Sequence, residues 1–451
     1  MLLAEPAACG HTKSTPMKLS YRKVFFYAMA LVFVTFGVYL TLLMRGLVFS
    51  DGTFSRTGGI FLNIIPSSAT LFVNGERYPT GSGIFDSGTL VTELPKGQYH
   101  LLVTADGMVS WEKVLAVEPG SVVARNYVRL FPVRADAVSV ASSSGTAFWK
   151  TGSAFILKTA SGTLELSQGI KISGSAVRSW DARSPLALVT SKSRMLVVDT
   201  SNPDADPADL SAIFPLGNVQ SALVLPHPFG PQQVIAASGK SLFTVDVRRG
   251  TTAKILSASR PIIAIGISDG SVFAADGKEI LAANLTFGTV RNVSFAGNPQ
   301  MLTPSPSGKF VAAASNGMVS IVGFATGTPI VSARADAFTF SPEERRFAAA
   351  EGNAVTVYYL DDWHTDFQKK AGDTARMTLA GQTPVNAMSW LDPQHLLVQR
   401  GTILAAVEID EELPTNTAVL ARNIVSFSYR YGDDVVYALT TEGIFEQIEL
   451  E

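Results

Sequence analysis

Acidic side chains cluster at two places in this 451-residue chain. The first cluster consists of Asp204, Asp206 and Asp209, whose carboxylate oxygens are the ligands that Ca²⁺ prefers. Two prolines interrupt this segment, and it lacks the central glycine of an EF-hand loop. A solvated loop is therefore the favoured interpretation, and a calcium site is the alternative.

The second cluster combines carboxylates, an imidazole and an indole ring: Asp361, Asp362, Trp363, His364 and Asp366. It falls in an unusually long unit of the repeat described below, so we expect an inserted loop there. Long loops on a rigid scaffold are where binding residues gather. A loop at the edge of a sheet, with a half-buried tryptophan, is favoured, and these five residues are the candidate binding residues.

No motif predicts a reaction. The chain has no nucleophile elbow, P-loop or dinucleotide fingerprint in a strand-turn-helix setting. Its single cysteine, Cys9, lies near the amino terminus, so the rest has no disulfide, thiolate metal site or cysteine nucleophile. We expect no catalytic residue and no cofactor. Trp149, Trp180 and Trp390 could line a carbohydrate platform, but packing is favoured because two of them begin repeats.

One apolar segment determines where these groups reside. Residues 24–43 are uncharged, and as a helix they would span about 30 Å, the thickness of a bilayer's hydrocarbon core. The run is longer than a signal peptide's apolar region, and no cleavage motif follows it. This predicts an uncleaved transmembrane helix, and a cleaved signal peptide is the rival.

Flanking charges predict the orientation. Four cations precede the run and two follow it, which favours a cytoplasmic tail at residues 1–23 and an extracytoplasmic location for residues 44–451. Met17 offers a second start, which would leave residues 1–16 untranslated. The expected location is a single-pass protein of the cell membrane.

Composition predicts a mainly β protein beyond the helix. Charged residues make up 16 % of the chain, and the net charge of −2 gives no general attraction to nucleic acid. Short runs rich in Val, Ile, Phe and Thr alternate with turn residues, which is typical of strands. About 390 residues of this pattern are too many for one sandwich, so we expect at least two domains.

After a linker at residues 44–58, residues 59–131 predict a small β-sandwich, with strands near 60–64, 71–73, 99–103 and 122–130. The dipeptide Asn74-Gly75 is a strong turn signal. With Pro66-x-x-Ala69, Pro95-Lys96-Gly97-Gln98-Tyr99 and Gly107-Met108, the order resembles the PEGA domain, although the Glu-Gly of its name is absent. The resemblance implies an envelope spacer or adhesive module without catalytic residues.

Residues 135–451 repeat themselves. The segments 305–314 (SPSGKFVAAA) and 341–350 (SPEERRFAAA) lie 36 residues apart, and weaker copies begin at Ser179, Ser389 and Ser428. A period near 40 with about four short strands per unit predicts the blades of a β-propeller. The repeats resemble the WD40-like and YVTN-like propellers. Eight units can be counted with a partial one at each end; since ring closure joins the ends, we predict seven blades, with eight as the alternative.

These features predict a non-enzymatic scaffold of a bacterial cell envelope. The propeller would be displayed outside the membrane to bind an envelope protein or a glycan, and no nucleic acid. The alternative is a propeller-type hydrolase or lyase that acts on envelope polysaccharide. An enzyme of that kind needs acidic residues or histidines where several blades begin. Those positions are mainly Ser, Pro, Trp and Ala, which favours binding.

Overall fold

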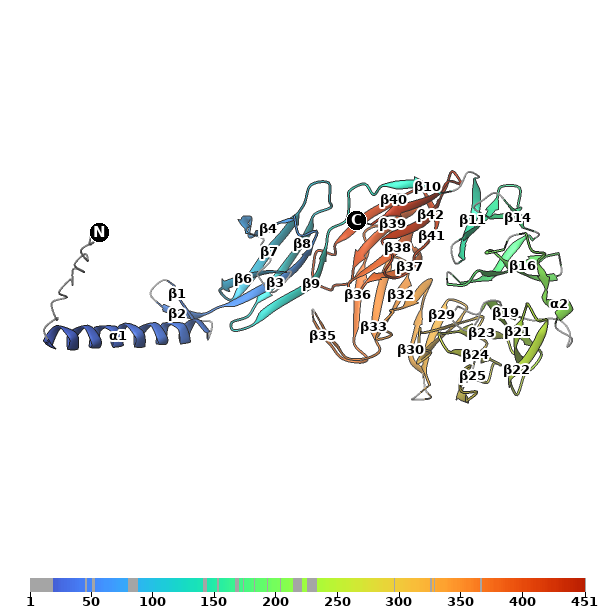
Figure 1. Ribbon diagram of the computed structural model, residues 1–451, viewed down its shortest axis with the longest axis horizontal. Helices are drawn as coiled ribbons and strands as arrows, with labels where there is room; N and C mark the ends of the chain where they lie inside the picture. Colours follow the sequence, from blue (N-terminus) through green and yellow to red (C-terminus); the bar gives the residue numbers. More distant parts are fainter. Residues whose placement is uncertain are drawn as a thin grey trace, which may run out of the picture. The chain divides into compact units, whose positions relative to one another are not determined.

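The computed structural model describes residues 19–450 apart from 45–46, 51–52, 80–87, 141–143, 152–153, 167–169, 173, 182, 193, 203, 214–220, 225–232, 296, 325–326, 328 and 366. These described residues form two helices and 43 strands, which confirms a mainly β fold (Figure 1). The chain divides into two compact units. One comprises residues 1–61, 90–99 and 116–123, and the other comprises residues 62–89, 100–115 and 124–451.

Helix α1 (Leu19–Met44) contains the predicted apolar run. Its segment Lys23–Thr41 is long and apolar enough to cross a membrane, and nothing in the structure covers it. The hydroxyls of Thr35 and Thr41 donate to the carbonyls of Leu31 and Gly37, both at 2.8 Å. Both hydroxyls are therefore satisfied within the helix, as an apolar environment demands. Most of the expected cytoplasmic tail, Cys9 included, lies outside the described residues.

The segment expected to be a linker contains two strands. Strand β1 (Leu47–Ser50) pairs antiparallel with β2 (Thr53–Arg56), from Leu47 opposite Arg56 to Ser50 opposite Thr53. The dipeptide Asp51-Gly52 between them is a hairpin signal that the sequence analysis did not use.

Residues 58–129 form two sheets, of strand order β5-β4-β7-β8 and β6-β3-β9. Their strands are β3 (Gly58–Ile65), β4 (Thr70–Val73), β5 (Glu76–Tyr78), β6 (Thr89–Leu94), β7 (Gly97–Thr104), β8 (Trp111–Val117) and β9 (Val122–Arg129). Ile60, Leu62 and Ile64 are buried, as alternation predicts. Asn74 and Gly75 have φ of 50° and 84°, which confirms the turn. Strands β5, β6 and β8 were not anticipated.

From residue 137 on, the described strands form eight four-stranded antiparallel sheets, numbered here in chain order. Sheet 1 is β11 (Gly145–Thr151), β12 (Ala154–Thr159), β13 (Leu164–Leu166) and β14 (Lys171–Ile172); sheet 2 is β15 (Ala176–Trp180), β16 (Leu186–Ser191), β17 (Arg194–Asp199) and β18 (Ala208–Asp209); helix α2 (Leu210–Ile213) follows; sheet 3 is β19 (Ser221–Val224), β20 (Gln233–Ser238), β21 (Ser241–Asp246) and β22 (Thr251–Ser257); sheet 4 is β23 (Ala264–Ile267), β24 (Ser271–Ala275), β25 (Glu279–Asn284) and β26 (Val290–Ser294).

The other four sheets follow the same pattern. Sheet 5 is β27 (Met301–Pro304), β28 (Phe310–Ser315), β29 (Met318–Gly323) and β30 (Pro329–Arg334); sheet 6 is β31 (Ala337–Phe340), β32 (Arg346–Glu351), β33 (Ala354–Tyr359) and β36 (Thr374–Thr378), with β34 (Trp363–His364) and β35 (Gln368–Lys369) inserted; sheet 7 is β37 (Val385–Asp392), β38 (His395–Arg400), β39 (Ile403–Glu408) and β40 (Thr417–Arg422); sheet 8 is β41 (Ile424–Ser428), β42 (Val435–Thr440), β43 (Phe445–Glu449) and β10 (Ala137–Ser139).

Buried apolar clusters join the sheets into a closed series. A cluster lies between each sheet and the next, from sheets 1 and 2 through to sheets 7 and 8. Phe148 and Leu157 of sheet 1 also share a cluster with Leu439 and Phe445 of sheet 8. Strand β10 pairs with β43, so the chain's two ends meet in one sheet. A ring of four-stranded sheets closed in this way is a β-propeller.

The described residues contain eight four-stranded sheets, whereas seven blades were preferred and eight were the alternative; the number of blades stays a prediction. Seven blades require the two partial end units to merge into one sheet. Only the single strand β10 joins sheet 8, however, and β11 to β14 form a complete sheet of their own. Strands β13 and β14 are only three and two residues long, so this unit carries little repeat signal.

The repeated Ser-Pro segments are the predicted turns between first and second strands. Ser305 lies between β27 and β28, and Ser341 lies between β31 and β32. Each serine is fully buried, and its hydroxyl accepts a hydrogen bond from the backbone N–H five residues on, at 3.1 Å from Phe310 and 3.0 Å from Arg346. A hydroxyl side chain suits this position because the buried N–H needs a partner.

Candidate binding site at the centre of the propeller

The first strands of the sheets line the centre of the propeller, because first strands of most successive sheets contact one another. Where they reach their turns, a cavity of about 470 Å³ opens. Six sheets contribute to its wall: Arg183, Ile267, Ser268, Asp269, Thr303, Pro304, Ser305, Pro306, Phe338, Thr339, Phe340, Pro342, Ser389, Trp390, Arg430 and Tyr431. A cavity of this size, with polar groups around an apolar wall, is typical of a ligand site.

The wall of this cavity includes one carboxylate, Asp269, which pairs with Arg183. Among the described first strands, β11, β15, β19, β23, β27, β31, β37 and β41, the sole Asp, Glu or His is Asp392. Its carboxylate oxygens lie 2.9 Å from Nδ1 of the buried His395, so it is already engaged. Hydrolysis of a glycoside needs two carboxyl groups that flank the bond. The described first strands supply no such pair.

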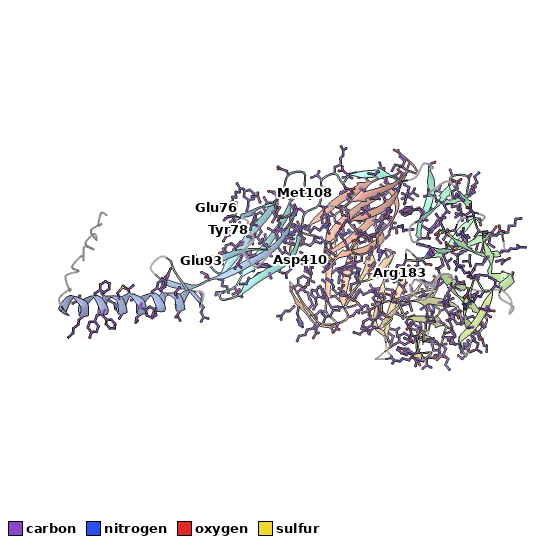
Figure 2. The ribbon with its side chains drawn as sticks, viewed as in Figure 1. Glu76, Tyr78, Glu93, Met108, Arg183 and Asp410 are labelled. Atoms are coloured by element: carbon purple, nitrogen blue, oxygen red, sulfur yellow. The ribbon has the colours of Figure 1, made fainter. Side chains whose placement is uncertain are left out.

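An ion bridge lies at the rim of the cavity. Arg183, labelled in Figure 2, follows β15 and pairs with Asp181 of its own turn, with 3.0 Å between Nη2 and Oδ2. It also pairs with Asp269 of sheet 4, so it connects two sheets that are not neighbours. The hydrogen bonds that the Arg183 guanidinium donates to Asp181, and then to Asp269, raise its pKa, so it is always charged. Because the three side chains are partly exposed, such a bridge is weak enough for a ligand to replace.

Aromatic side chains also reach the centre. Tyr431 lies in the wall and is 42 % exposed, and burial of its hydroxyl raises its pKa. Trp180 is 45 % exposed and makes an edge-to-face contact with Trp149, their ring centroids 6.2 Å apart. Trp390 is only 2 % exposed, and its Nε1 donates to the carbonyl of Thr339 at 3.4 Å. Packing is therefore confirmed for Trp390, whereas Trp180, which also begins a repeat, presents its ring to solvent.

The acidic cluster at 361–366 lies in the expected insertion, since β34 and β35 separate β33 from β36. Trp363 is 5 % exposed, more buried than expected, and its ring stacks on Arg346 with 3.8 Å from Cζ to the centroid. Oδ2 of Asp361 lies 3.6 Å from Nζ of Lys309, and Asp362 accepts a hydrogen bond from a backbone N–H.

These contacts account for most of the cluster. A backbone hydrogen bond from Asp362, then the charges of Lys309 and Arg345, lower the pKa of Asp361. His364 is exposed, and Asp366 lies outside the described residues. The tryptophan and the two aspartates thus serve the loop itself, and a binding role for this cluster stays a prediction.

One of the three candidate calcium ligands has other partners. Asp209 accepts a hydrogen bond from the N–H of Ser211 at 2.9 Å, and its Oδ2 lies 3.6 Å from Nε of Arg194. Within the part of the chain that the structure describes, no three His, Cys, Asp or Glu side chains are grouped to hold a metal ion. The calcium alternative for Asp204, Asp206 and Asp209 gains no support.

A buried ion cluster in the larger unit has no counterpart in the sequence analysis. Lys113 of β8 is fully buried, with Nζ 3.1 Å from Glu408 and 3.2 Å from Asp410, which is labelled in Figure 2. Arg125 of β9 pairs with Glu412. Burial raises the pKa of the Asp410 carboxyl, and the charge of Lys113 opposes that rise. A lysine in an alternating strand reads as a solvent-facing residue, so the sequence alone gave no signal of this cluster.

Comparison with known proteins gives a fold likeness only. No family model matches the chain, so membership of the PEGA family stays a prediction, and no curated protein is significantly similar. Among solved structures, Sqt1 of Saccharomyces cerevisiae is 12 % identical, with 70 % of this chain and 98 % of that one covered, at a TM-score of 0.46. Hsv2p of Kluyveromyces lactis is 11 % identical, with 62 % and 99 % covered, at 0.43. Hydrazine synthase of Kuenenia stuttgartiensis is 14 % identical, with 60 % and 94 % covered, at 0.39. Likenesses at this level indicate nothing about activity or partners.

Proposed function

We propose that this chain is a membrane-anchored binding scaffold whose eight-bladed propeller presents its central cavity to a protein or glycan partner. The observation that carries the proposal is the cavity itself. It has about 470 Å³ of space, and its wall includes an exchangeable ion bridge and the half-exposed Tyr431. The described first strands carry one acidic residue, and that residue binds a histidine. This composition suits recognition through hydrogen bonds and ring stacking.

The number of blades is part of this proposal. Eight four-stranded sheets, eight clusters between them and the pairing of β10 with β43 all support an eight-bladed ring. A central space of this size fits a larger ring, because the first strands lie farther from the axis as blades are added.

The location belongs to the proposal too. Helix α1 is long and apolar enough to span a membrane, and the positive charges that precede it favour a cytoplasmic amino terminus. We place the β-domains outside the cytoplasm of a bacterial cell, with the PEGA-like residues 59–131 as a spacer. A tether of this kind raises the local concentration of the propeller near its envelope partner.

Photo-crosslinking in intact cells tests the proposal. A benzophenone amino acid at Tyr431 or Trp180 should trap one and the same partner, whereas the same group at Ile330, exposed on the outermost strand β30, should not. Protease added outside the cells should digest the propeller. Protection from that protease would reverse the topology. Identical adducts from all three positions, or release of a polysaccharide fragment by the purified protein, would refute the binding role.

A further inference from the structure

A second hollow of about 440 Å³ lies between sheets 4 and 5 of the propeller. Sheet 4 supplies residues of β24, β25 and β26 and of the turn between β25 and β26. Sheet 5 supplies the turn after β27 and Phe324, which follows β29. The wall includes Phe273, Phe287, Arg291, Gly308, Lys309 and Phe324. The turn at 305–309 borders both hollows, since Ser305 and Pro306 line the central cavity.

Phe287 is displayed at the edge of this hollow. It is 79 % exposed, the highest exposure among the large apolar side chains of the described residues. Its turn is rigid, because Oδ1 of Asn284 accepts hydrogen bonds from the N–H groups of Thr286, at 2.9 Å, and Phe287, at 2.8 Å. Gly288 completes the turn with φ of 66°. The turn fixes the backbone from which this exposed ring projects, and burial of a large aromatic side chain is typical of an interface anchor.

The floor of the hollow is aromatic and closely packed. Phe273 is 1 % exposed and contacts Phe324, with 5.4 Å between ring centroids. Above it the chain passes as Gly308, where a Cβ would come within 2.8 Å of the Phe273 ring. The turn therefore packs directly on the Phe273 ring, with no room for a side chain at position 308.

The charged residues of the wall are both cations. Nζ of Lys309 lies 3.6 Å from Asp361, which itself does not line the hollow. Arg291 is exposed on the outermost strand β26, and no ion pair joins it to another described residue. The chain as a whole is nearly balanced, with a net charge of −2, whereas both charged side chains of this wall are cationic. Charge complementarity therefore favours an acidic occupant.

We propose that this hollow docks an acidic segment of a protein partner, with an apolar or aromatic side chain against Phe287 and Phe324 and a carboxylate on Arg291. The inference rests on the proposed binding function and names the chemistry of its partner. An anionic membrane surface would also attract Phe287 and Arg291, but a flat surface would not fill a hollow lined by aromatic rings. The hollow is why we favour a peptide.

Selection from a random twelve-residue peptide library on phage, against the full-length protein held in neutral phosphatidylcholine nanodiscs, tests this inference. Enriched peptides should pair Asp or Glu with Phe, Trp, Tyr or Leu. Phe287→Ala should weaken binding of the best peptide at least tenfold, as the loss of an interface anchor does. Arg291→Glu should weaken it several-fold and reduce its salt dependence. The matched controls, Ile330→Ala and Arg334→Glu on strand β30, should leave binding unchanged.

Three results would overturn it: no enrichment, enrichment of neutral or basic peptides, or equal losses in the variants and their controls. A fourth would be capture of anionic vesicles by the nanodisc-held protein, lost in Arg291→Glu, together with no peptide binding. Crosslinking at Tyr431 and Trp180 is independent of this hollow. If it traps a partner while Phe287→Ala has no effect, the acidic-segment inference fails and the scaffold function stands.

Discussion

Replacing Lys113 by methionine tests how the small β-sheets are held to sheet 7 within the larger unit. The side chain keeps its length and apolar stem but loses its ammonium group. That group donates to the carbonyls of Glu412, at 2.8 Å, and Pro414, at 3.1 Å, and faces the carboxylates of Glu408 and Asp410. The two carbonyls and the two carboxylates remain after the substitution. They then lack the hydrogen bonds and the positive charge that the ammonium group supplies.

The two carboxylates do not lose equally. Glu408 keeps hydrogen bonds from Nε1 of Trp111, at 3.0 Å, and Nδ2 of Asn416, at 2.7 Å. Asp410 keeps a backbone N–H at 2.8 Å and Arg125 at 3.8 Å. The uncompensated charge therefore falls mainly on Asp410. Removing one partner of a buried ion pair typically costs 3–5 kcal/mol, and with these remaining contacts we expect about 3 kcal/mol at pH 7.

The loss should depend on pH in a defined direction. The pKa of Asp410 is already raised by burial above its ordinary 3.8, and without Lys113 it rises further. The penalty is complete at a pH above the raised folded pKa. It disappears as the pH falls through that value and below 3.8, where the carboxyl is protonated in both states. Asp410→Asn in the Lys113→Met background should therefore recover much of the stability at neutral pH.

Thermal unfolding and amide hydrogen exchange of the full-length protein in detergent provide the assay. Exchange should accelerate in β8 and β39, which carry the cluster, and not in β24. Lys96→Met is the matched control, because its ion pair with Glu118 is exposed and should contribute at most about 1 kcal/mol. A loss no larger than that of the control, or no recovery with Asp410→Asn, would refute the reasoning.

Two further predictions concern the propeller alone. Burial lowers the pKa of His395, but the charge and hydrogen bonds of Asp392 outweigh burial and raise that pKa above 6.5. Protonation of His395 therefore stabilises the folded state. This stability is lost as the pH rises through the folded pKa. The unfolding temperature should fall above neutral pH, and His395→Gln should flatten that dependence; the same slope in the variant would contradict the assignment. Gly308→Ala, whose Cβ would meet Phe273, should destabilise by about 1–3 kcal/mol more than Gly317→Ala, which has a similar φ and nothing within 4 Å, when both are compared by chemical denaturation.

The turns of the propeller could be predicted from sequence because their signals are local. Ser305 and Ser341 mark equivalent turns of sheets 5 and 6, where a buried hydroxyl must satisfy a backbone N–H. The same holds for Asn74, whose positive φ few residues tolerate. The number of sheets depends instead on where a single strand, β10, pairs after more than three hundred residues. No local pattern encodes that choice.

The candidate sites were harder to predict for the same reason. Arg183 and Asp269 stand in different repeats, and only the ring brings them together. The cluster around Trp363 looked like a binding site because its residue types are chemically versatile. In the structure Arg346 occupies the indole face, so the tryptophan's surface is used internally. Residue type alone does not distinguish a ring that binds a ligand from one that packs on a neighbouring arginine.

The ion cluster around Lys113 and the proposed peptide site lie on different sheets of the propeller. The ion cluster lies at sheet 7, whereas Phe287 and Arg291 belong to sheet 4, with sheets 5 and 6 between them. Buried apolar clusters between neighbouring sheets pack sheets 4 to 7 into one body. These sheets therefore keep fixed positions relative to one another. A substitution at Lys113 should therefore weaken the hold on sheet 7 and leave peptide affinity at Phe287 unchanged, because additivity is expected of distant sites without shared partners.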